Sequence, residues 1–370
     1  MRSALEDLWL PDASNETRLV VALVSGSHFV QHTYLMLLPP LFLALQSEFD
    51  ASLAALGLAA GVVNGVVVVL QLPLGHVSDA HSREWVLGTS HLFGVLGTVL
   101  VAVAPNYWWL LGASVVLGVG VAGHHPAHFP MLADAARSDE RGRAFSLHGF
   151  AGILGFAAPF ALTSLVLGAG LSWRYVVGTV AVVGALYGAV CLLVVRTRVS
   201  RDVRVPTREP TGGGPLGPRI AAALRSLVTS TGILALTLLS LLSSMASFGI
   251  QTYVPVLLTH AYGFAPTDAT TLTTAMVVVM AFVVLVGGVL VDRVPATNVL
   301  FAGFVALAVL SAALATGSLP LPLVVAVVVP LAATLSIARP ARAKLGDTLS
   351  ERDELGKNFG VITIGISVGA

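Results

Sequence analysis

Charged residues are scarce in this chain of 370 residues, and their scarcity excludes a water-soluble protein. Lys, Arg, Asp and Glu together make up only 11% of the sequence, and hydrophobic residues make up 56%. A soluble chain of this length needs far more charge to cover its surface. The mean hydropathy is +0.88. The composition therefore indicates a polytopic membrane protein.

Cysteine and intramembrane acids are also nearly absent. The single Cys191 lies inside an apolar run, so the chain can build neither a disulfide framework nor a cysteine metal site. All 19 acidic residues fall in the termini, loops or span ends, so the membrane core lacks the carboxylate that many proton-coupled carriers use. The first 18 residues do not have the pattern of a signal peptide, and the first apolar run is expected to stay in the mature protein.

Apolar runs of about 20 residues are long enough to cross a bilayer as helices. The sequence contains eleven, at residues 19–45, 53–74, 86–104, 108–132, 144–167, 174–195, 220–262, 269–291, 299–315, 320–337 and from near 359 onward. The seventh run is too long for one crossing and is interpreted as a helix with a preceding interfacial segment. The predicted fold class is all-α, a polytopic membrane protein of two pseudo-symmetric six-helix bundles, with the twelfth span absent from this chain.

The distribution of basic residues predicts the orientation. Of the 20 Lys and Arg residues, all but Arg174 fall on one side of the predicted spans, together with the N-terminus. Basic loops mark the cytoplasmic side. The chain is therefore expected to be a multi-pass protein of the cell membrane, with a cytoplasmic N-terminus. Four parts are predicted: a cytoplasmic N-terminal segment 1–18, an N-terminal bundle 19–195, a flexible cytoplasmic linker 196–219 rich in Arg, Pro and Gly, and an incomplete C-terminal bundle 220–370.

An internal repeat supports two halves. "PLGHVSDAHS" is echoed by "LVGGVLVDRVP", and "RGRAFSLHGFAGILG" by "LGKNFGVITIGISVG", at almost the same offset, so that Gly75 corresponds to Gly288 and Gly155 to Gly369. Parallel six-span repeats of this kind build one large class of secondary transporters. The first half continues for another span and a half after Gly155, so the chain is expected to be either a fragment or a shortened natural protein.

The motif residues resemble those of the major facilitator superfamily. "GHVSDAHSRE" keeps Gly75, Asp79 and Arg83 of the signature that follows the second span in that family, and "GVLVDRVPAT" keeps Asp292 and Arg293 in the second copy. The resemblance implies a transporter that works by alternating access. Within the superfamily, "GHHPAHFP" followed by "RGRAFSLHGFAGILGFAAPF" is similar to the fosmidomycin-resistance type of efflux carrier, which implies proton-driven export of a small anionic drug.

The repeated carboxylates predict a cytoplasmic gate. A carboxylate at the end of one helix can be held by the positive N-terminus of another helix and by nearby cations. The predicted gate comprises Gly75, Asp79, Arg83, Arg141, Arg143, Asp292, Arg293 and Lys357. The alternative interpretation is a set of solvated loop charges that contribute little.

A substrate or proton path is predicted from the polar residues inside the apolar runs. Histidines are candidates because their ordinary pKa lies near physiological pH, and neighbours four residues apart share one helical face. The predicted path comprises His28, Gln31, His32, Asn64, His124, His125, His128, His148, Ser247, Gln251 and Arg339. The alternative is that individual histidines are neutral and bonded to backbone carbonyls, and that the serines bond their own backbone.

A metal site at His124 and His128 is not predicted, although both imidazoles share one helical face. No Cys, Asp or Glu nearby completes three ligands. In the repeat, "HHPAH" corresponds to "ARPAR", which places Arg339 opposite His125 and Arg342 opposite His128. Such a position favours positive charge, either to attract an anion or because the helix meets the cytoplasm there.

The predicted function is secondary active transport, with proton-coupled export of a small organic, anionic or drug-like solute. Two alternatives stay open, a facilitated uptake carrier for a small anion and a shortened, non-transporting membrane sensor or partner protein. An enzyme is not predicted, since no nucleophile, carboxylate pair or metal set shares a cavity. The expected partners are the solute, protons and the lipid bilayer, without nucleic acid and without a cofactor, and the chain is expected to be a monomer.

Overall fold

The computed structural model describes residues 13–206, 217, 230–349, 362 and 365–369, and all regular structure within them is helical. The chain divides into two compact units. Unit 1 comprises Met1–Leu38, Leu45–Pro159 and Leu171–Gly213, and unit 2 comprises Pro39–Ala44, Phe160–Gly170 and Gly214–Ala370. Each unit is a helical bundle, which agrees with the predicted fold class.

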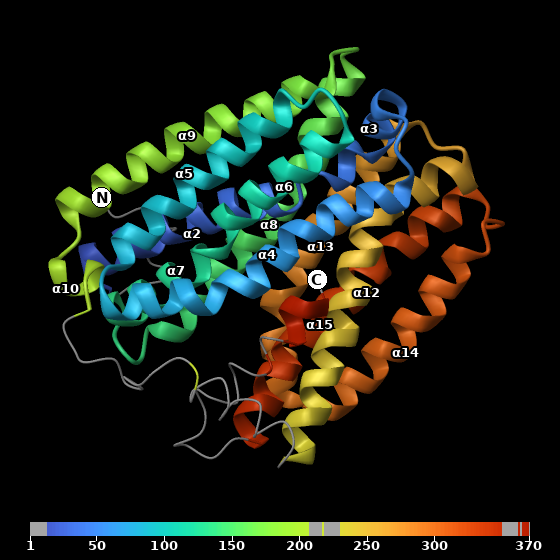
Figure 1. The fold of residues 1–370 in the computed structure, drawn as a ribbon. Helices are drawn as coiled ribbons and strands as arrows, with labels where there is room; N and C mark the ends of the chain where they lie inside the picture. The colour runs from blue at the N-terminus through green and yellow to red at the C-terminus, as the bar shows by residue number, and fades with distance from the viewer. Residues whose placement is uncertain (1–12, 207–216, 218–229, 350–361, 363–364, 370) are drawn as a thin grey trace, which may run out of the picture. The chain divides into compact units, whose positions relative to one another are not determined.

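Unit 1 contains most of the first half of the chain (Figure 1). Its helices are α2 (Asn15–Leu35), α3 (Phe42–Phe49) from Leu45 onward, α4 (Leu53–Ala80), α5 (Arg83–Ala102), α6 (Tyr107–Ala122), α7 (His124–Ala135), α8 (Arg141–Gly168) as far as Pro159, α9 (Trp173–Arg198) and α10 (Arg201–Arg204). Several of them begin where a side chain accepts a hydrogen bond from the backbone of the first turn, at Ser14, Ser52, Ser82 and Asn106. In Figure 1, α5 and α9 lie side by side along one flank of the unit.

Glycines allow close helix contacts inside unit 1. A Cβ added at Gly97 of α5 would lie 2.5 Å from the backbone N and Cα of Leu117 in α6. A Cβ at Gly120 of α6 would meet the backbone of Gly94 in α5. The two helices therefore touch backbone to backbone, as small residues permit in membrane bundles.

The predicted end of the first span, residue 45, is wrong, because the first helix stops ten residues earlier. Helix α2 ends at Leu35, and "MLLPP" leads into a short 3-10 turn, η1 (Pro39–Leu41), before α3. Two consecutive prolines lack the backbone N–H groups that continue a helix, and they disfavour helical geometry in the residue before each of them.

The fourth predicted span, 108–132, is one membrane crossing but two helices. The interruption falls at Gly123, between α6 and α7. Pro126 has no N–H to donate to the carbonyl of Ala122, so the regular hydrogen-bond ladder fails here. The break places His124 at the first position of α7.

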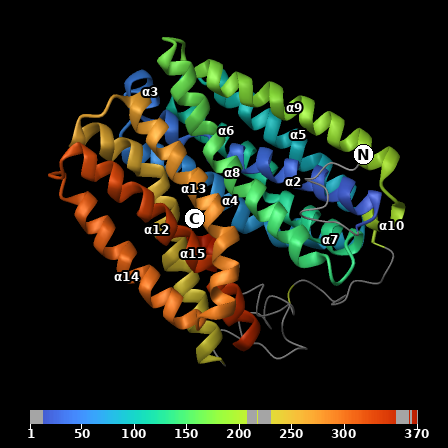
Figure 2. The same cartoon turned by 180° about the vertical axis from the view of Figure 1, so that it is seen from behind.

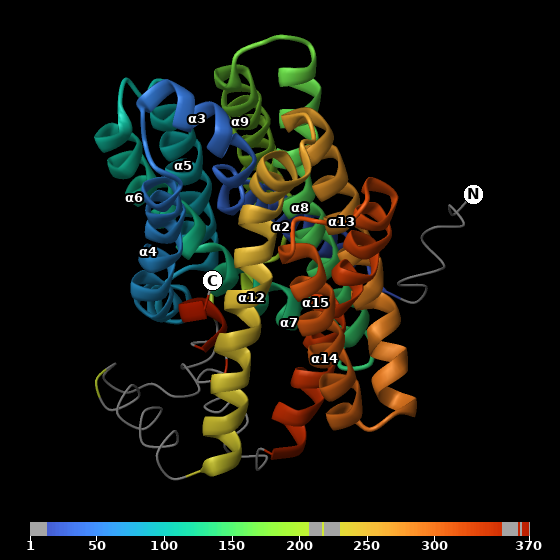
Figure 3. The same ribbon diagram turned by 90° about the vertical axis from the view of Figure 1, so that its right-hand side faces the viewer.

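Unit 2 contains α12 (Thr231–Tyr262), α13 (Pro266–Arg293), α14 (Ala296–Ala315) and α15 (Leu321–Leu349). Figure 3 shows these four helices running along one another. Helix α12 ends at Gly263, whose φ of 70° is the left-handed conformation that closes a helix. A small core of Val291, Val299, Leu300 and Ala338 joins α13, α14 and α15.

Four predictions fall partly or wholly on residues outside the described ranges. They are the N-terminal segment 1–18, described from residue 13, the interfacial segment before Thr231, half of the linker 196–219, and the eleventh span, of which only Ile362 and residues 365–369 are described. In the described part of the predicted linker, α9 continues to Arg198 and α10 follows it.

Nine helical segments among the described residues are long and apolar enough to cross a membrane. The α6–α7 pair counts as one of them, Tyr107–Ala135. Helix α2 is not among the nine despite its 21 residues, because its second half is rich in polar side chains.

The one basic residue on the predicted non-cytoplasmic side, Arg174, is held by an acid. Its Nη1 lies 2.5 Å from Glu48 Oε1, and its Nη2 donates to the carbonyl of Ala104 at 2.9 Å. Trp173 Nε1 donates to the other oxygen of Glu48 at 2.6 Å. The pKa of Glu48 is lowered from its ordinary value, first by the hydrogen bond from Trp173 and then by Arg174, against the opposing effect of burial.

This contact predicts a pH dependence. A lowered pKa means that Glu48 stabilises unit 1 fully above its ordinary value of 4.5 and loses this contribution as the pH falls through the lowered value. We expect the unfolding temperature of the wild type to fall more steeply below pH 4.5 than that of Glu48→Gln, measured by thermal unfolding in detergent. Asp139→Asn, in an exposed ion pair with Arg137, is the control and should follow the wild type. Identical profiles for the wild type and Glu48→Gln would contradict the expectation.

Candidate functional site

Seven buried or half-buried imidazoles gather inside unit 1. We call them the histidine cluster: His28 and His32 of α2, His91 of α5, His124, His125 and His128 of α7, and His148 of α8. Figure 2 shows α2, α7 and α8 close together within unit 1. Six of the seven were predicted as path residues, but as separate features on three spans. The structure brings them into one set.

Glycines of α8 bring α2 close enough for this contact. A Cβ at Gly152 would meet the ring of His28, and a Cβ at Gly155 would meet the backbone of Phe29 and, at 3.0 Å, the Cβ of His32. The ring of His28 stacks on that of His148, with centroids 4.0 Å apart. Small residues at the crossing therefore decide where the α2 imidazoles lie.

The two imidazoles of α2 bond to backbone carbonyls of α8. His28 Nδ1 lies 2.8 Å from the carbonyl oxygen of His148, and His32 Nδ1 lies 2.9 Å from that of Gly152. Their Nε2 atoms lie 2.9 Å from one another. The alternative noted in the sequence, histidines bonded to carbonyls, thus describes one nitrogen of each ring, while the other nitrogens point toward each other.

Ser27 connects two further members of the cluster. Its Oγ lies 2.8 Å from His91 Nε2 and 2.9 Å from His128 Nε2. A hydroxyl can donate to one imidazole while it accepts from the other. The serine therefore links α5 and α7 through α2.

Sequence reasoning missed His91 and Ser27. The signal for His91 was a lone histidine in the apolar run "GTSHLFGVLG". A single histidine has no neighbour at helical spacing to draw attention to it, and its partners come from other helices.

Gln31 is buried on α2, directly before His32 in the chain. Its side chain is 0% exposed, and neither its amide nitrogen nor its oxygen is bonded within the described part of the chain. Buried amides are normally satisfied, so an unbonded one suits a residue that meets water or a solute. Asn64, also predicted for the path, is half-buried in α4.

The remaining predicted path residues lie in unit 2. Gln251 and Ser247 are buried on α12, where Gln251 Nε2 donates to the carbonyl of Ser247 at 2.9 Å and to its hydroxyl at 3.0 Å. Arg339 is half-buried on α15. A small apolar cavity of about 220 Å³ lies elsewhere in this unit, against Pro39, Pro255 and Pro266.

The two units contain contacts of the same kind. In unit 1, His128 bonds to Ser27 of α2, and in unit 2, Arg342 bonds to Ser243 of α12. The paired glycines behave alike as well. A Cβ at Gly155 would meet a backbone carbonyl of α2, and a Cβ at Gly369 would meet the carbonyl of Leu241 in α12. The glycine pair predicted from the sequence repeat thus makes the same kind of close contact with α2 in unit 1 and with α12 in unit 2.

The predicted gate residue Arg83 is bonded within unit 1. Its Nη1 lies 2.6 Å from Asp134 Oδ2 of α7 and donates to the carbonyl of Val203 at 3.0 Å. The Arg83 side chain is only 9% exposed. Gly75 and Asp79 are half-buried on α4, and Asp134 was not predicted as a partner.

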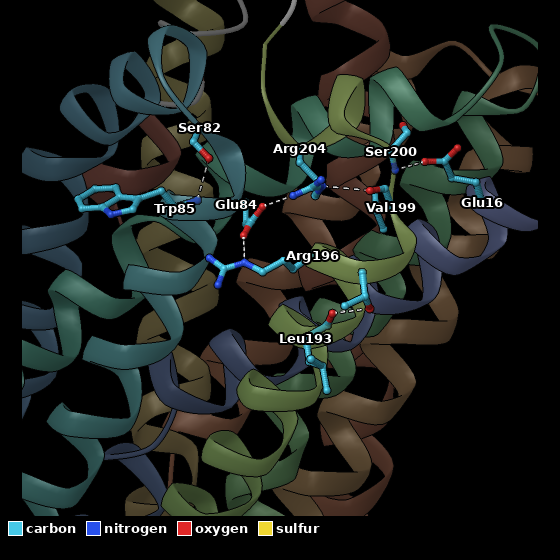
Figure 4. Close-up of polar contacts among 10 residues, drawn as sticks. Glu16, Ser82, Glu84, Trp85, Leu193, Arg196, Val199, Ser200 and Arg204 are labelled. Carbon is cyan, nitrogen blue, oxygen red and sulfur yellow. Dashed lines mark hydrogen bonds and ion pairs between the residues drawn. The ribbon is translucent and has the colours of Figure 1, made fainter.

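The next residue, Glu84, extends this charged end of unit 1. Its two oxygens accept from Arg196 Nε and from Arg204 Nη1, both at 2.7 Å (Figure 4). Glu16 of α2 accepts from the backbone N–H of Ser200 at 2.6 Å. These bonds attach the end of α9 and all of α10 to α5 and α2.

The structure describes some of the other predicted gate residues and not the rest. Arg141 and Arg143 are exposed in the first turn of α8, and Arg293 is exposed in the last turn of α13. Asp292 lies in α13, but its side chain is outside the described set, and Lys357 lies outside the described residues.

The sequence profile of the Major Facilitator Superfamily matches residues 24–370. The chain belongs to this superfamily. A solved superfamily structure, of a bacterial homologue of the human lysosomal transporter Spinster, inward-facing and occupied, shares the fold with a TM-score of 0.76 at 16% identity, over 96% of this chain and 80% of that one. The protein is thus a multi-pass membrane protein with the fold of a transporter rather than of an enzyme.

Two curated superfamily relatives are similar in sequence. The fosmidomycin resistance protein of Escherichia coli strain K12 is 25% identical over 74% of this chain and 65% of its own length. The multi-drug resistance efflux pump PmrA homolog of Lactococcus lactis is 28% identical over 33% of this chain and 29% of its own length. The chain therefore spans less than two thirds of the length of these relatives.

Proposed function

We propose that this member of the superfamily is a secondary active transporter that exports a small organic solute, anionic or drug-like, across the cell membrane in exchange for protons. The observation that carries the proposal is the set of buried polar side chains around α2. Polar groups inside a membrane bundle are costly and mark solute or ion paths. The names of the two relatives, one of a resistance protein and one of an efflux pump, support the export direction.

The path that we propose runs along the histidine cluster and Gln31. Ser27 connects His91 with His128, and ring contacts continue the set to His148 and His28. Such a series of donors and acceptors can pass a proton or hold an anion. We further propose the orientation and the parts predicted from the sequence, with the N-terminus, the charged end of unit 1 and the linker in the cytoplasm, and a monomeric carrier.

Transport in everted membrane vesicles tests the proposal. Fosmidomycin and structurally unrelated drugs are added to energised vesicles that contain the full chain, and the proton gradient is followed with a quenched dye. We expect at least one drug to release quenching, and drug accumulation to collapse with an uncoupler. Flux that is insensitive to the uncoupler would instead support the facilitated carrier, and no flux for any drug would contradict export.

Gln31→Ala is the informative variant. Because the Gln31 amide has no bonded partner in the described structure, its removal breaks no hydrogen bond there, and the unfolding temperature should fall only through the cavity that the shorter side chain leaves. We expect it to reduce the drug-dependent proton signal by about tenfold, equivalent to about 1.4 kcal/mol. Gln46→Ala, in α3 and outside the cluster, is the matched control and should transport normally. Normal transport by Gln31→Ala would remove this residue from the path.

A further inference from the structure

Four members of the histidine cluster present ring nitrogens to a common point. One nitrogen each of His28, His32, His124 and His125 lies within 4.8 Å of those of the other three. The sequence offers His124 and His128 at metal-ligand spacing on one helix. In the structure His125, not His128, joins His124 in this group, and α2 adds His28 and His32.

The hydrogen bonds fix which nitrogens are available. A carbonyl oxygen only accepts, so the bonds to His148 O and Gly152 O require a proton on Nδ1 of both His28 and His32. In the neutral rings, both Nε2 atoms then carry lone pairs. These atoms lie 2.9 Å apart, where two lone pairs repel each other unless a cation lies between them.

His124 follows the same rule. Its Nδ1 bonds to the carbonyl of Val121, which leaves the Nε2 lone pair, and this Nε2 has no hydrogen-bond partner within the described residues. His125 Nδ1 has none there either. Three rings thus donate one N–H to a backbone carbonyl and present the other nitrogen, the arrangement in which metal-bound histidines are held.

We propose that His28, His32, His124 and His125 bind a divalent transition-metal ion of the Zn²⁺ class. Imidazole nitrogens suit Zn²⁺, Ni²⁺ and Cu²⁺, and no carboxylate or thiolate joins this group within the described residues, which disfavours Mg²⁺ and Ca²⁺. Tetrahedral Zn²⁺ places its nitrogen ligands about 3.3 Å apart. Side-chain rotations that displace the ring nitrogens by about 1 Å would bring the four atoms to this spacing.

The surroundings suit a fixed ion. The four ligands come from two helices, α2 and α7, and the carbonyls that orient His28 and His32 come from a third, α8. Phe156 stacks on His32 with centroids 4.2 Å apart and limits its rotation. Neutral imidazoles leave the charge of the ion uncompensated, which favours an anion beside the site.

Metal binding by the purified full chain in detergent tests the proposal. After removal of any affinity tag and stripping with a chelator, Zn²⁺ is titrated in competition with a chromophoric chelator. We expect one equivalent per chain with a Kd of about 1 µM or tighter. His28→Gln and His124→Gln should each raise the Kd at least tenfold, whereas His81→Gln and His260→Gln, which change exposed histidines outside the cluster, should not.

Cobalt spectroscopy gives a second measurement that needs no variant. Co²⁺ bound to the wild type should show the intense visible bands of tetrahedral coordination, and these bands should disappear when Zn²⁺ is added. A Kd weaker than about 100 µM, a weak octahedral spectrum, or equal losses in the control variants would overturn the proposal. The inference does not depend on the proposed transport function, because binding is measured without flux.

Discussion

Replacing Gly120 with leucine is expected to prevent unit 1 from folding, whereas the same replacement at Gly112 is expected to be tolerated. A Cβ at Gly120 would meet the backbone nitrogen of Gly94 and would lie 2.6 Å from its Cα and 2.8 Å from the carbonyl carbon of Phe93. Backbone atoms cannot rotate away as a side chain can. Relief of the clash requires α5 and α6 to separate along the contact that Gly97 also forms.

The expected cost of Gly120→Leu is at or above the upper end of the about 1–3 kcal/mol that overpacking usually costs. We expect loss of the monodisperse peak in size-exclusion chromatography of the detergent extract. Gly112 lies on the same helix, and a Cβ there would have no atom within 4 Å. Gly112→Leu therefore controls for the helix and for the added side chain. A monodisperse Gly120→Leu protein with the melting temperature of the wild type would show that this contact is not close.

Asp134→Ala is expected to destabilise unit 1 far more than Asp139→Ala. The Arg83 side chain is 9% exposed and pairs with Asp134 at 2.6 Å, so removal of the acid leaves a largely buried guanidinium bonded, within the described residues, to the carbonyl of Val203. The fully buried limit of about 3–5 kcal/mol does not apply, because Asp134 is itself 47% exposed and partly screened by water. We expect about 1–3 kcal/mol.

The Arg137–Asp139 pair is the matched control for this effect. Both of its side chains are more than 60% exposed, at 65% and 63%, so Asp139→Ala should cost less than about 0.5 kcal/mol. Urea unfolding of the full chain in detergent measures both variants, and a double-mutant cycle with Arg83→Ala isolates the pair. Equal effects of the two aspartate variants would mean that burial of Arg83 does not govern the energy.

The sequence predicts the helical crossings well, since apolar runs fix their place along the chain. The helix ends depend on residues that act locally. Pro39 and Pro40 explain the early end of α2, and Pro126 explains the break before His124. Both interruptions could therefore have been predicted from the sequence. They were missed because a hydropathy run continues through a proline that the hydrogen-bond ladder does not tolerate.

The sequence predicts six of the seven histidines of the candidate site, but not how they are arranged. Helical spacing identified His28 with His32 and His124 with His128, because those pairs share a face of one helix. Contacts between helices depend on which faces meet, and here Gly152 and Gly155 decide this. For the same reason His91, Ser27 and Asp134 escaped prediction, as each finds its partner on another helix.

The polarity of α2 has a consequence for how the protein enters the membrane. A helix is inserted on its own when the transfer of its side chains into lipid is favourable, and polar side chains near its centre oppose this. Helix α2 does not reach the hydropathy of the nine other crossing segments. It is synthesised before α7 and α8, yet the groups that contact its two imidazoles lie on these later helices. We therefore expect α2 to insert stably only after these later helices emerge, so that the residues of the site also set the order of assembly.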